Sequence, residues 1–436
     1  MQVMKWSVLA LAVTAGTAQL AMASAQSEAK GFIEDSDLQL FNRALYHNRD
    51  FKHGAASDTG NGISEEFGLG TRVLFESGFT QGTIGFGVDA HTLTSTKLDT
   101  GRGRVGIGQF ATDSEGRGED NQTEAGAAVK ARLSNTTLKY GNQFVASPVF
   151  STDDSRILPE VATGTYLTST EVEGLELSAG RFTAMSSQTA TYRDSINGRD
   201  DDTGLKNPGL KSANIYGANY QVNDDLLVAA HYSDIEDYWT KKYFNVNYNI
   251  PLSEEQAVNF DVQYYKTQDQ GDELEGKQDN TLWSLAAAYS FGAHTLTAAY
   301  QSSSGDTGYS YGVDGGGSIW VANSVQISDF NGEDEKSYQL RYDLDMESYG
   351  VPGLSFMTRY ITANDITLRD DDGNQLATTG DEHEWNFETK YVIQEGAAKD
   401  LSMRVRHAIY RGNNAYAADS SMNDTRLIVE YPLDIL

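Results

Sequence analysis

The segment Ser337–Met346 alternates strictly between two kinds of side chain. Its even-numbered positions are apolar or aromatic, whereas its odd-numbered positions are polar or charged and include Arg341, Asp343 and Asp345. Successive side chains of a β-strand point to opposite faces, so this segment would carry one apolar and one charged face. A chain built from such strands is more typical of a transmembrane β-barrel with a charged lumen than of a soluble domain. The alternation recurs in the segments 67–75, 127–133, 283–291, 354–360, 385–393, 401–409 and 427–433.

Residues 1–25 have the features of a secretory signal peptide. Lys5 precedes an apolar run, and the small residues Ala23 and Ala25 allow cleavage after either of them. Beyond this segment there is no run of about 18 apolar residues that could form a spanning helix. We therefore expect an exported chain in which residues 26–436 form a single β-barrel domain.

The composition narrows the classes of partner and cofactor. The chain contains no cysteine, which excludes disulfides and zinc sites built on cysteine. Its 62 acidic residues outnumber 33 basic ones, and the net charge of −29 argues against nucleic acid as a partner. The acids concentrate in expected loops such as 113–124 and 269–279. Three interpretations of these acids are open: they are solvated loop tips, they contact the divalent cations that bridge lipopolysaccharide, or they attract cations to a pore mouth.

The connections between the expected strands come in two lengths. Short turns such as 223–225 fit the periplasmic rim of an outer-membrane barrel, and long polar loops such as 101–122 fit the extracellular rim. Tyr and Trp residues near strand ends, for example Tyr232, Tyr238 and Trp239, fit either aromatic girdles at the lipid interfaces or ordinary cross-strand pairs.

Nothing in the sequence indicates an enzyme. The seven histidines show no metal-ligand spacing, and no serine stands in the context of a nucleophile, such as Gly-x-Ser-x-Gly after a buried strand. The glycines at 101–106 lie in an expected loop without a following helix, so they do not indicate a nucleotide site. Strand-like sequence begins at about Leu38, which leaves no room for a plug domain. We expect no catalytic residue, no metal and no cofactor.

Blocks of sequence along nearly the whole chain resemble the OprD family of substrate-specific outer-membrane porins, and they occur in the family's order. The blocks are GFIEDS at 31–36, ESGFTQGTIGFGVDA at 76–90, SPVF at 147–150, RILP at 156–159, YQSSSGD at 300–306, ANSVQ at 322–326, GVPGL at 350–354 and RLIVEYPL at 426–433.

The resemblance implies an antiparallel transmembrane β-barrel of 18 strands in the outer membrane of a Gram-negative bacterium, with loops folded inward to constrict the pore. It implies passive diffusion of small carboxylate-bearing solutes, namely basic amino acids, related peptides or carbapenems. The expected partners are these small molecules, membrane lipids and lipopolysaccharide, and the outer-membrane assembly machinery. The barrel would stand alone or associate as a loose homotrimer.

The family lines one wall of its pore with a ladder of basic residues that guides the substrate carboxylate. An arginine suits this task because its guanidinium donates in a fixed fork that matches a carboxylate, and a row of such sites passes an anion along without a deep trap. The alternative is that each basic residue merely pairs with an acid in the lumen. By similarity the ladder contains Arg43, Arg49, Lys130, Arg132, Arg404, Arg406 and Arg426, and the polar-face pattern adds Arg359 and Lys390.

Three aspartates are expected on the opposite, acidic side of the pore. Asp306 matches the family's acidic residue near the constriction, where it would bind an ammonium or guanidinium group, or it is an ordinary turn aspartate. Asp153 and Asp154 depart from small uncharged residues of the family, and they either favour cations in the constriction or face solvent. This departure keeps two other functions open, a general diffusion porin and a porin for another carboxylate substrate.

Overall fold

The computed structural model describes residues 24–53, 55–57, 60–193, 209–315, 317, 319–370, 373–413, 416 and 421–436. The expected signal peptide, residues 1–25, lies almost wholly outside the described residues, which begin at Ser24. Among the described residues, no helix is long and apolar enough to cross a membrane.

The described chain forms eighteen β-strands and one short 3-10 helix, η1, at Glu347–Tyr349. The strands are β1 (Asp37–Phe51), β2 (Ile63–Glu76), β3 (Ile84–Asp99), β4 (Asn121–Leu133), β5 (Thr136–Gln143), β6 (Val161–Val172), β7 (Leu175–Ser186), β8 (Ala213–Asn223), β9 (Leu226–Ile235), β10 (Trp239–Ser253), β11 (Gln256–Asp269), β12 (Asp279–Phe291), β13 (His294–Gly305), β14 (Lys336–Asp345), β15 (Leu354–Arg369), β16 (Gln375–Val392), β17 (Ser402–Gly412) and β18 (Met422–Asp434).

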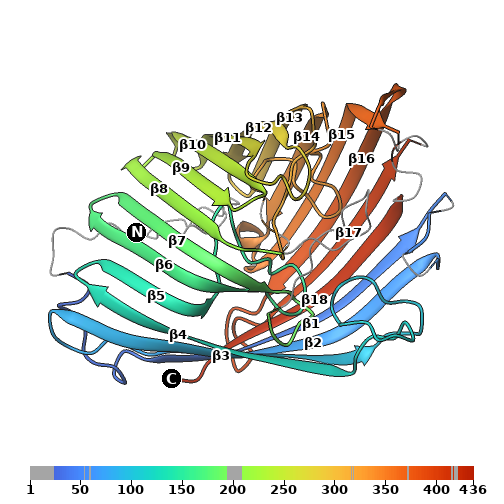
Figure 1. Cartoon of the computed structure of the whole chain (residues 1–436). Coiled ribbons are helices and arrows are strands. Elements are labelled where there is room, and N and C mark those ends of the chain that lie inside the picture. The colour runs from blue at the N-terminus through green and yellow to red at the C-terminus, as the bar shows by residue number, and fades with distance from the viewer. Residues whose placement is uncertain are drawn as a thin grey trace.

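The strands form one closed antiparallel barrel. Each strand pairs with its neighbours in sequence, and β1 pairs with β18 as well as with β2. The strands wrap around a common interior at a tilt (Figure 1). Closure leaves no sheet edge, so the backbone N–H and C=O groups are satisfied within the barrel and lipid can surround it. The expected fold, an 18-stranded antiparallel barrel, is confirmed.

The alternation in the sequence places apolar side chains outside and polar ones inside. On β14, Tyr338 and Leu340 are exposed on the outer surface, whereas Ser337 and Gln339 are buried in the interior. A band of such outward apolar residues provides the surface that contacts lipid. Inward positions can be polar wherever the lumen is wet, because only the outward positions need to be apolar.

The two rims of the barrel differ as expected from the connection lengths. One rim, here the turn rim, holds the start of β1, the end of β18 and two-residue turns such as 134–135 and 224–225. The other, the loop rim, holds the longer connections 100–120, 144–160 and 306–335. In outer-membrane barrels the short turns lie on the periplasmic side.

The 144–160 and 306–335 loops fold into the barrel and pack on one side of its interior. Val149 and Phe150 from the first loop join Val313 and Val321 from the second in one buried apolar cluster. Figure 1 shows the 306–335 loop turning inward beside β13 and β14. The strand residues of this cluster come from β6 to β12 and include Phe182, Met185, Trp239, Tyr243, Tyr265 and Leu282.

A smaller cluster fixes the 100–120 loop inside the barrel. Phe110 packs with Ile157 of the 144–160 loop and with Leu45 and Leu93 of the wall. The larger apolar cluster thus lies on the β6–β12 side of the interior. The expected inward-folded loops are therefore present.

We predict that Leu285→Lys destabilises the barrel by about 2–4 kcal/mol, because it places a charge on the lipid-facing surface. Leu285 is 39% exposed on that surface, midway along β12. The matched variant Ala286→Lys places the same charge in the lumen, where Asp261 is its neighbour in register on β11. Unfolding of both variants in lipid vesicles checks this, and equal destabilisation would contradict the assignment of the two faces.

Candidate functional site

One side of the lumen, here the basic wall, carries a continuous group of cationic side chains. The wall is formed by the inward positions of β14–β18 and β1–β2, and its basic residues are Arg341, Arg359, Lys390, Arg404, Arg406, Arg426, Arg43, Arg49 and Arg72. The strand register brings cations directly opposite each other, since Arg341 faces Arg359, Lys390 faces Arg404, and Arg406 faces Arg426. Like charges at this spacing repel, so the wall depends on compensating groups.

Carboxylates interleaved with the cations supply part of this compensation. Glu388 forms ion pairs with two arginines, with its oxygens 3.6 Å from Arg404 Nε and 3.2 Å from Arg406 Nε. Arg43 Nε lies 2.7 Å from a carboxylate oxygen of Glu430 on β18. These pairs support, for part of the set, the alternative that the basic residues serve to neutralise acids in the lumen.

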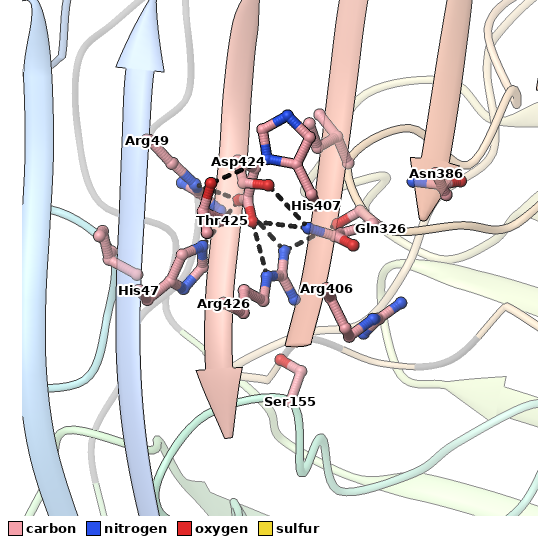
Figure 2. A network of polar contacts seen from close by, with 12 residues as sticks. His47, Arg49, Ser155, Gln326, Asn386, Arg406, His407, Asp424, Thr425 and Arg426 are labelled. Atoms are coloured by element: carbon pink, nitrogen blue, oxygen red, sulfur yellow. Dashed lines mark hydrogen bonds and ion pairs between the residues drawn. The ribbon is translucent and has the colours of Figure 1, made fainter. Parts of the chain in front are cut away.

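Asp424 lies at the centre of the most densely connected polar network on the wall (Figure 2). Its side chain is fully buried and accepts from Arg426 Nε at 2.9 Å, from Arg49 Nε at 3.3 Å and from Gln326 Nε2 at 2.8 Å. His47 Nε2 lies 2.7 Å from the same carboxylate. Arg426 also donates to the backbone carbonyl of Gln326 at 2.8 Å, so the network joins β1, β18 and the 306–335 loop.

Two arginines fasten the 144–160 loop to the wall. Arg72 donates through both terminal nitrogens to Asp154, at 2.9 and 2.5 Å, and Arg43 Nη1 donates to the same carboxylate at 2.8 Å. Arg43 Nη1 also lies 2.6 Å from the carbonyl of Arg156. Burial would raise the pKa of Asp154, but the hydrogen bonds and charges of Arg72 and Arg43 outweigh it and hold that pKa below its ordinary value.

Arg156 adds a loop cation to the wall. Its Nε donates to the carbonyl of Ile107 at 2.7 Å. Burial, and then the positive charges of Arg426 and Arg49, lower the pKa of Arg156 to about 10. The residue therefore still carries its charge near neutral pH, and the loop contributes to the positive potential of the pore.

Buried glutamates hold the other two inward loops. Glu66 on β2 accepts the backbone N–H groups of Gly106, Ile107 and Gln109 at 2.9–3.2 Å, which fixes the 100–120 loop. Glu384 on β16 accepts the N–H groups of Ile327 and Ser328 at 3.2 and 2.9 Å. An acceptor that takes several N–H groups compensates the cost of burying both the carboxylate and the loop backbone.

The two ladder residues added from the polar-face pattern lie on the basic wall with little acidic compensation. Arg359 is buried and its Nε donates to the amide oxygen of Asn386 at 2.7 Å. Lys390 is half-buried, and no ion pair or hydrogen bond joins its side chain to another described residue. Together with Arg404, whose nearest carboxylate is shared with Arg406, these are the least neutralised cations of the wall.

Lys130 and Arg132 lie apart from the basic wall, on β4. Lys130 Nζ is 2.6 Å from Asp89, which also pairs with Lys139 at 2.5 Å. Arg132 lies over the ring of Phe79 at 4.0 Å from its centroid and donates from Nε to Gln26 at 3.1 Å. The residues expected to form one ladder thus fall into two groups on different stretches of the barrel.

The three expected acidic residues occupy different surroundings. Asp154 is engaged by Arg43 and Arg72, as described above. Asp153 is half-buried and accepts from Gln188 Nε2 at 3.0 Å. Asp306 is exposed at the loop rim directly after β13. The structure does not bring the three carboxylates together as one acidic wall.

Sequence reasoning did not select Arg72, Lys139, Arg156 or Asp424 as site residues. The alternation already placed Arg72 on a polar face, and Asp424 lies two positions from Arg426, hence on the same face of the strand. Those signals identified the lumen face, but they could not show which inward residue an incoming loop would meet.

The pattern Gly-x-Ser-x-Gly does occur once, at 308–312, in the 306–335 loop. It does not follow a buried strand that leads into a helix, and the Ser310 hydroxyl is hydrogen-bonded to Gln278. The context of a nucleophile is therefore missing there.

Comparison with known proteins identifies the family. Residues 30–435 match the family described as outer membrane porin, OprD family. The chain belongs to the OprD family. It is 44% identical to Porin D of Pseudomonas aeruginosa over all of both chains. The crystal structure of Acinetobacter baumannii OccAB1 superposes with a TM-score of 0.85 at 32% identity, over 95% of this chain and 100% of that one. A structure of Pseudomonas aeruginosa OpdK with vanillate has a TM-score of 0.80 at 29% identity and covers 93% and 100%.

This membership confirms the resemblance that the sequence blocks indicated. As an OprD-family porin, the protein is a channel of the Gram-negative outer membrane through which small molecules pass, and it is not an enzyme.

We predict that Asp424→Asn lowers the free energy of unfolding by about 3 kcal/mol, because Arg426 and Arg49 lose a buried partner. The matched variant is Asp343→Asn. Asp343 also pairs with the arginine two residues away on its strand, but its side chain is 31% exposed, so its loss is expected to be below about 1 kcal/mol. Chemical unfolding of both refolded variants tests this, and equal losses would contradict a special role of Asp424.

We predict that the 144–160 loop stays attached to the wall from neutral pH down to about pH 4 and is released below that. A carboxyl whose pKa is depressed by folding stabilises the structure above its ordinary pKa of about 3.9, and this is lost as pH falls through the lower folded value. Single-channel conductance against pH measures the release, and Asp154→Asn should show the acid behaviour already at pH 7. A wild-type transition near pH 6–7 would assign the release to another group.

Proposed function

We propose that this porin conducts small carboxylate-bearing solutes selectively and passively, with basic amino acids, related peptides and carbapenems as its substrates. The observation that carries this proposal is the incomplete neutralisation of the basic wall. Lys390 and Arg404 face each other across β16 and β17, and the nearest paired acid, Glu388, is shared with Arg406.

A substrate carboxylate would step along the wall between partly compensated cations. A cation with a fully committed acid partner binds a passing carboxylate weakly, whereas a cation without such a partner binds it more strongly. Sharing one glutamate between two arginines gives intermediate binding, which conduction requires. In this proposal the ladder consists of Arg43, Arg49, Arg359, Lys390, Arg404, Arg406 and Arg426, with Lys130 and Arg132 as a separate pair nearer the turn rim.

The positive end of a basic amino acid needs acceptors away from the wall. We assign this role to Asp153 at the 144–160 loop, and to Asp306 as a first contact at the exposed loop rim. Asp154 is committed to Arg43 and Arg72, so its contribution is to hold the loop in place.

One similar structure supports a carboxylate as the recognised group. Vanillate, the molecule named with the OpdK structure, bears a carboxylate but no cationic group. A porin for another carboxylate substrate is therefore the second candidate, and the acidic residues decide between the two. The inward packing of three loops argues against a general diffusion porin, because it removes the wide aqueous lumen that size-based passage needs.

Two assembly properties belong to the same proposal. The barrel would be inserted by the outer-membrane assembly machinery amid lipid and lipopolysaccharide, and barrels would associate loosely as trimers. Chemical crosslinking in native membranes would detect the trimer, and only monomers at saturating crosslinker would exclude it.

The deciding experiment is single-channel recording of the refolded protein in planar bilayers with L-arginine and agmatine as paired blockers. Agmatine retains the guanidinium but lacks the carboxylate. Low conductance with block by arginine and little block by agmatine supports the proposal. Equal block by both would remove the carboxylate from recognition, and a large conductance insensitive to both would indicate a general pore.

We predict that the double variant Arg404→Ala with Arg406→Ala lowers arginine uptake at least roughly tenfold, the loss expected for removing charged hydrogen-bond donors. Barrel assembly should be intact, as judged by heat-modifiable electrophoretic mobility. Lys399→Ala, which removes an exposed cation from the nearby 393–401 turn, is the control and should transport normally. Failure of the double variant to fold would instead assign both arginines a structural role.

A further inference from the structure

The segment of residues 26–36 before β1 lies against the turn rim and contacts two of its turns. The backbone N–H of Gln26 donates to the carbonyl of Ser134 at 3.1 Å. Further along, the N–H of Gly78 donates to the carbonyl of Phe32 at 2.9 Å. The segment is thus docked on the barrel rather than projecting from it.

Gln26 inserts its side chain into the rim and is only 3% exposed. Its amide nitrogen donates to the carbonyls of Thr80 and Gly82 at 2.9 and 3.1 Å. The absence of a side chain at Gly85 makes room for it, since a Cβ there would lie 2.3 Å from the Gln26 amide oxygen. With both donors of the amide engaged, its oxygen is aimed in a fixed direction.

That amide oxygen accepts from Arg132 Nε at 3.1 Å. The Arg132 guanidinium also lies over the Phe79 ring, 4.0 Å from its centroid. One edge and one face of the guanidinium are therefore held by neutral groups, and Asp35 is a nearby acid that interacts with its charge. Among the described residues, neither terminal nitrogen of Arg132 has a hydrogen-bond acceptor, unlike those of Arg43 and Arg72.

We propose that Gln26 is a positioning residue of the transport path, which holds Arg132 as the carboxylate-binding group at the turn-rim mouth of the pore. The inference rests on the proposed function, because it assumes that substrates carry a carboxylate. Lys130 and Lys139, which share Asp89 nearby, add net positive charge to this mouth. Residues 26–36 would then belong to the channel as well as to its fold.

A purely structural role for Gln26 is the competing explanation. In that case its substitution would loosen the rim and change conduction from both sides alike. A positioning role makes a narrower claim, namely that the effect passes through Arg132 and is confined to one mouth. A double-mutant cycle separates the two, since a residue acting through another has no further effect once that residue is removed.

The test uses the full-length mature protein in planar bilayers, with L-arginine added to one side at a time and barrels inserted in known orientation. Gln26→Ala should raise the blocking concentration from the turn-rim side roughly tenfold, as expected for one lost hydrogen bond to a charged group. Block from the loop-rim side should be unchanged. In the Arg132→Ala background, Gln26→Ala should add nothing. Gln394→Ala is the control, because Gln394 lies at the same rim but its side chain, among the described residues, is hydrogen-bonded only to the carbonyl of Val392.

Equal changes from both sides, an additive effect in the Arg132→Ala background, or no change at all would each overturn the proposal. Failure of this proposal can be distinguished from failure of the proposed function. If the wild type is not blocked by arginine from either side, the proposed substrate class fails. The reversal potential in a KCl gradient then decides about Gln26, because Gln26→Ala should reduce anion selectivity only while Arg132 is present.

Discussion

The shape of the pore depends on carboxylates that accept hydrogen bonds inside the barrel. Glu66 and Glu384 each accept backbone N–H groups of a different loop, and Asp424 receives two arginines and the side chain of Gln326. A loop that turns into a barrel brings polar backbone groups with it, and these must find partners there. Without such acceptors the loops would gain more from solvent, and the lumen would be wide.

The same carboxylates also make the basic residues of the wall differ in how far their charge is neutralised. Near the loops, Arg43, Arg72 and Arg426 are engaged by carboxylates, and their first task is to hold Asp154 and Asp424 in place. Further along the wall, Arg404 shares one acid and Lys390 has no partner among the described residues. The same wall therefore contains cations that hold the loops of the constriction and cations that can bind a solute. The difference between them is whether a carboxylate engages the cation fully.

Much of the fold was predictable because strand periodicity and barrel closure are local consequences of sequence. The alternation identified which face of β14 is polar, and hence that Arg341 points inward. Fold and family are confirmed, whereas the roles of the site residues stay predictions. The loop attachments were beyond reach, since Arg72 and Asp154 are 82 positions apart and Gln326 and Asp424 are 98 apart. Nothing in alternation fixes which inward side chain a distant loop will meet, and for the same reason Lys130 and Arg132 could not be separated from the wall.

The position of the Asp424 network has a consequence for biogenesis. His47 and Arg49 belong to the first strand and Asp424 and Arg426 to the last, so the network spans the seam where β1 meets β18. His47 and Arg49 meet Asp424 only when the two ends of the sheet join. A barrel intermediate in which β1 and β18 are not yet paired would therefore lack both the last row of backbone hydrogen bonds and part of the charge pattern of the wall. Closure of the barrel satisfies the remaining backbone groups and completes the charged surface of the pore in a single step.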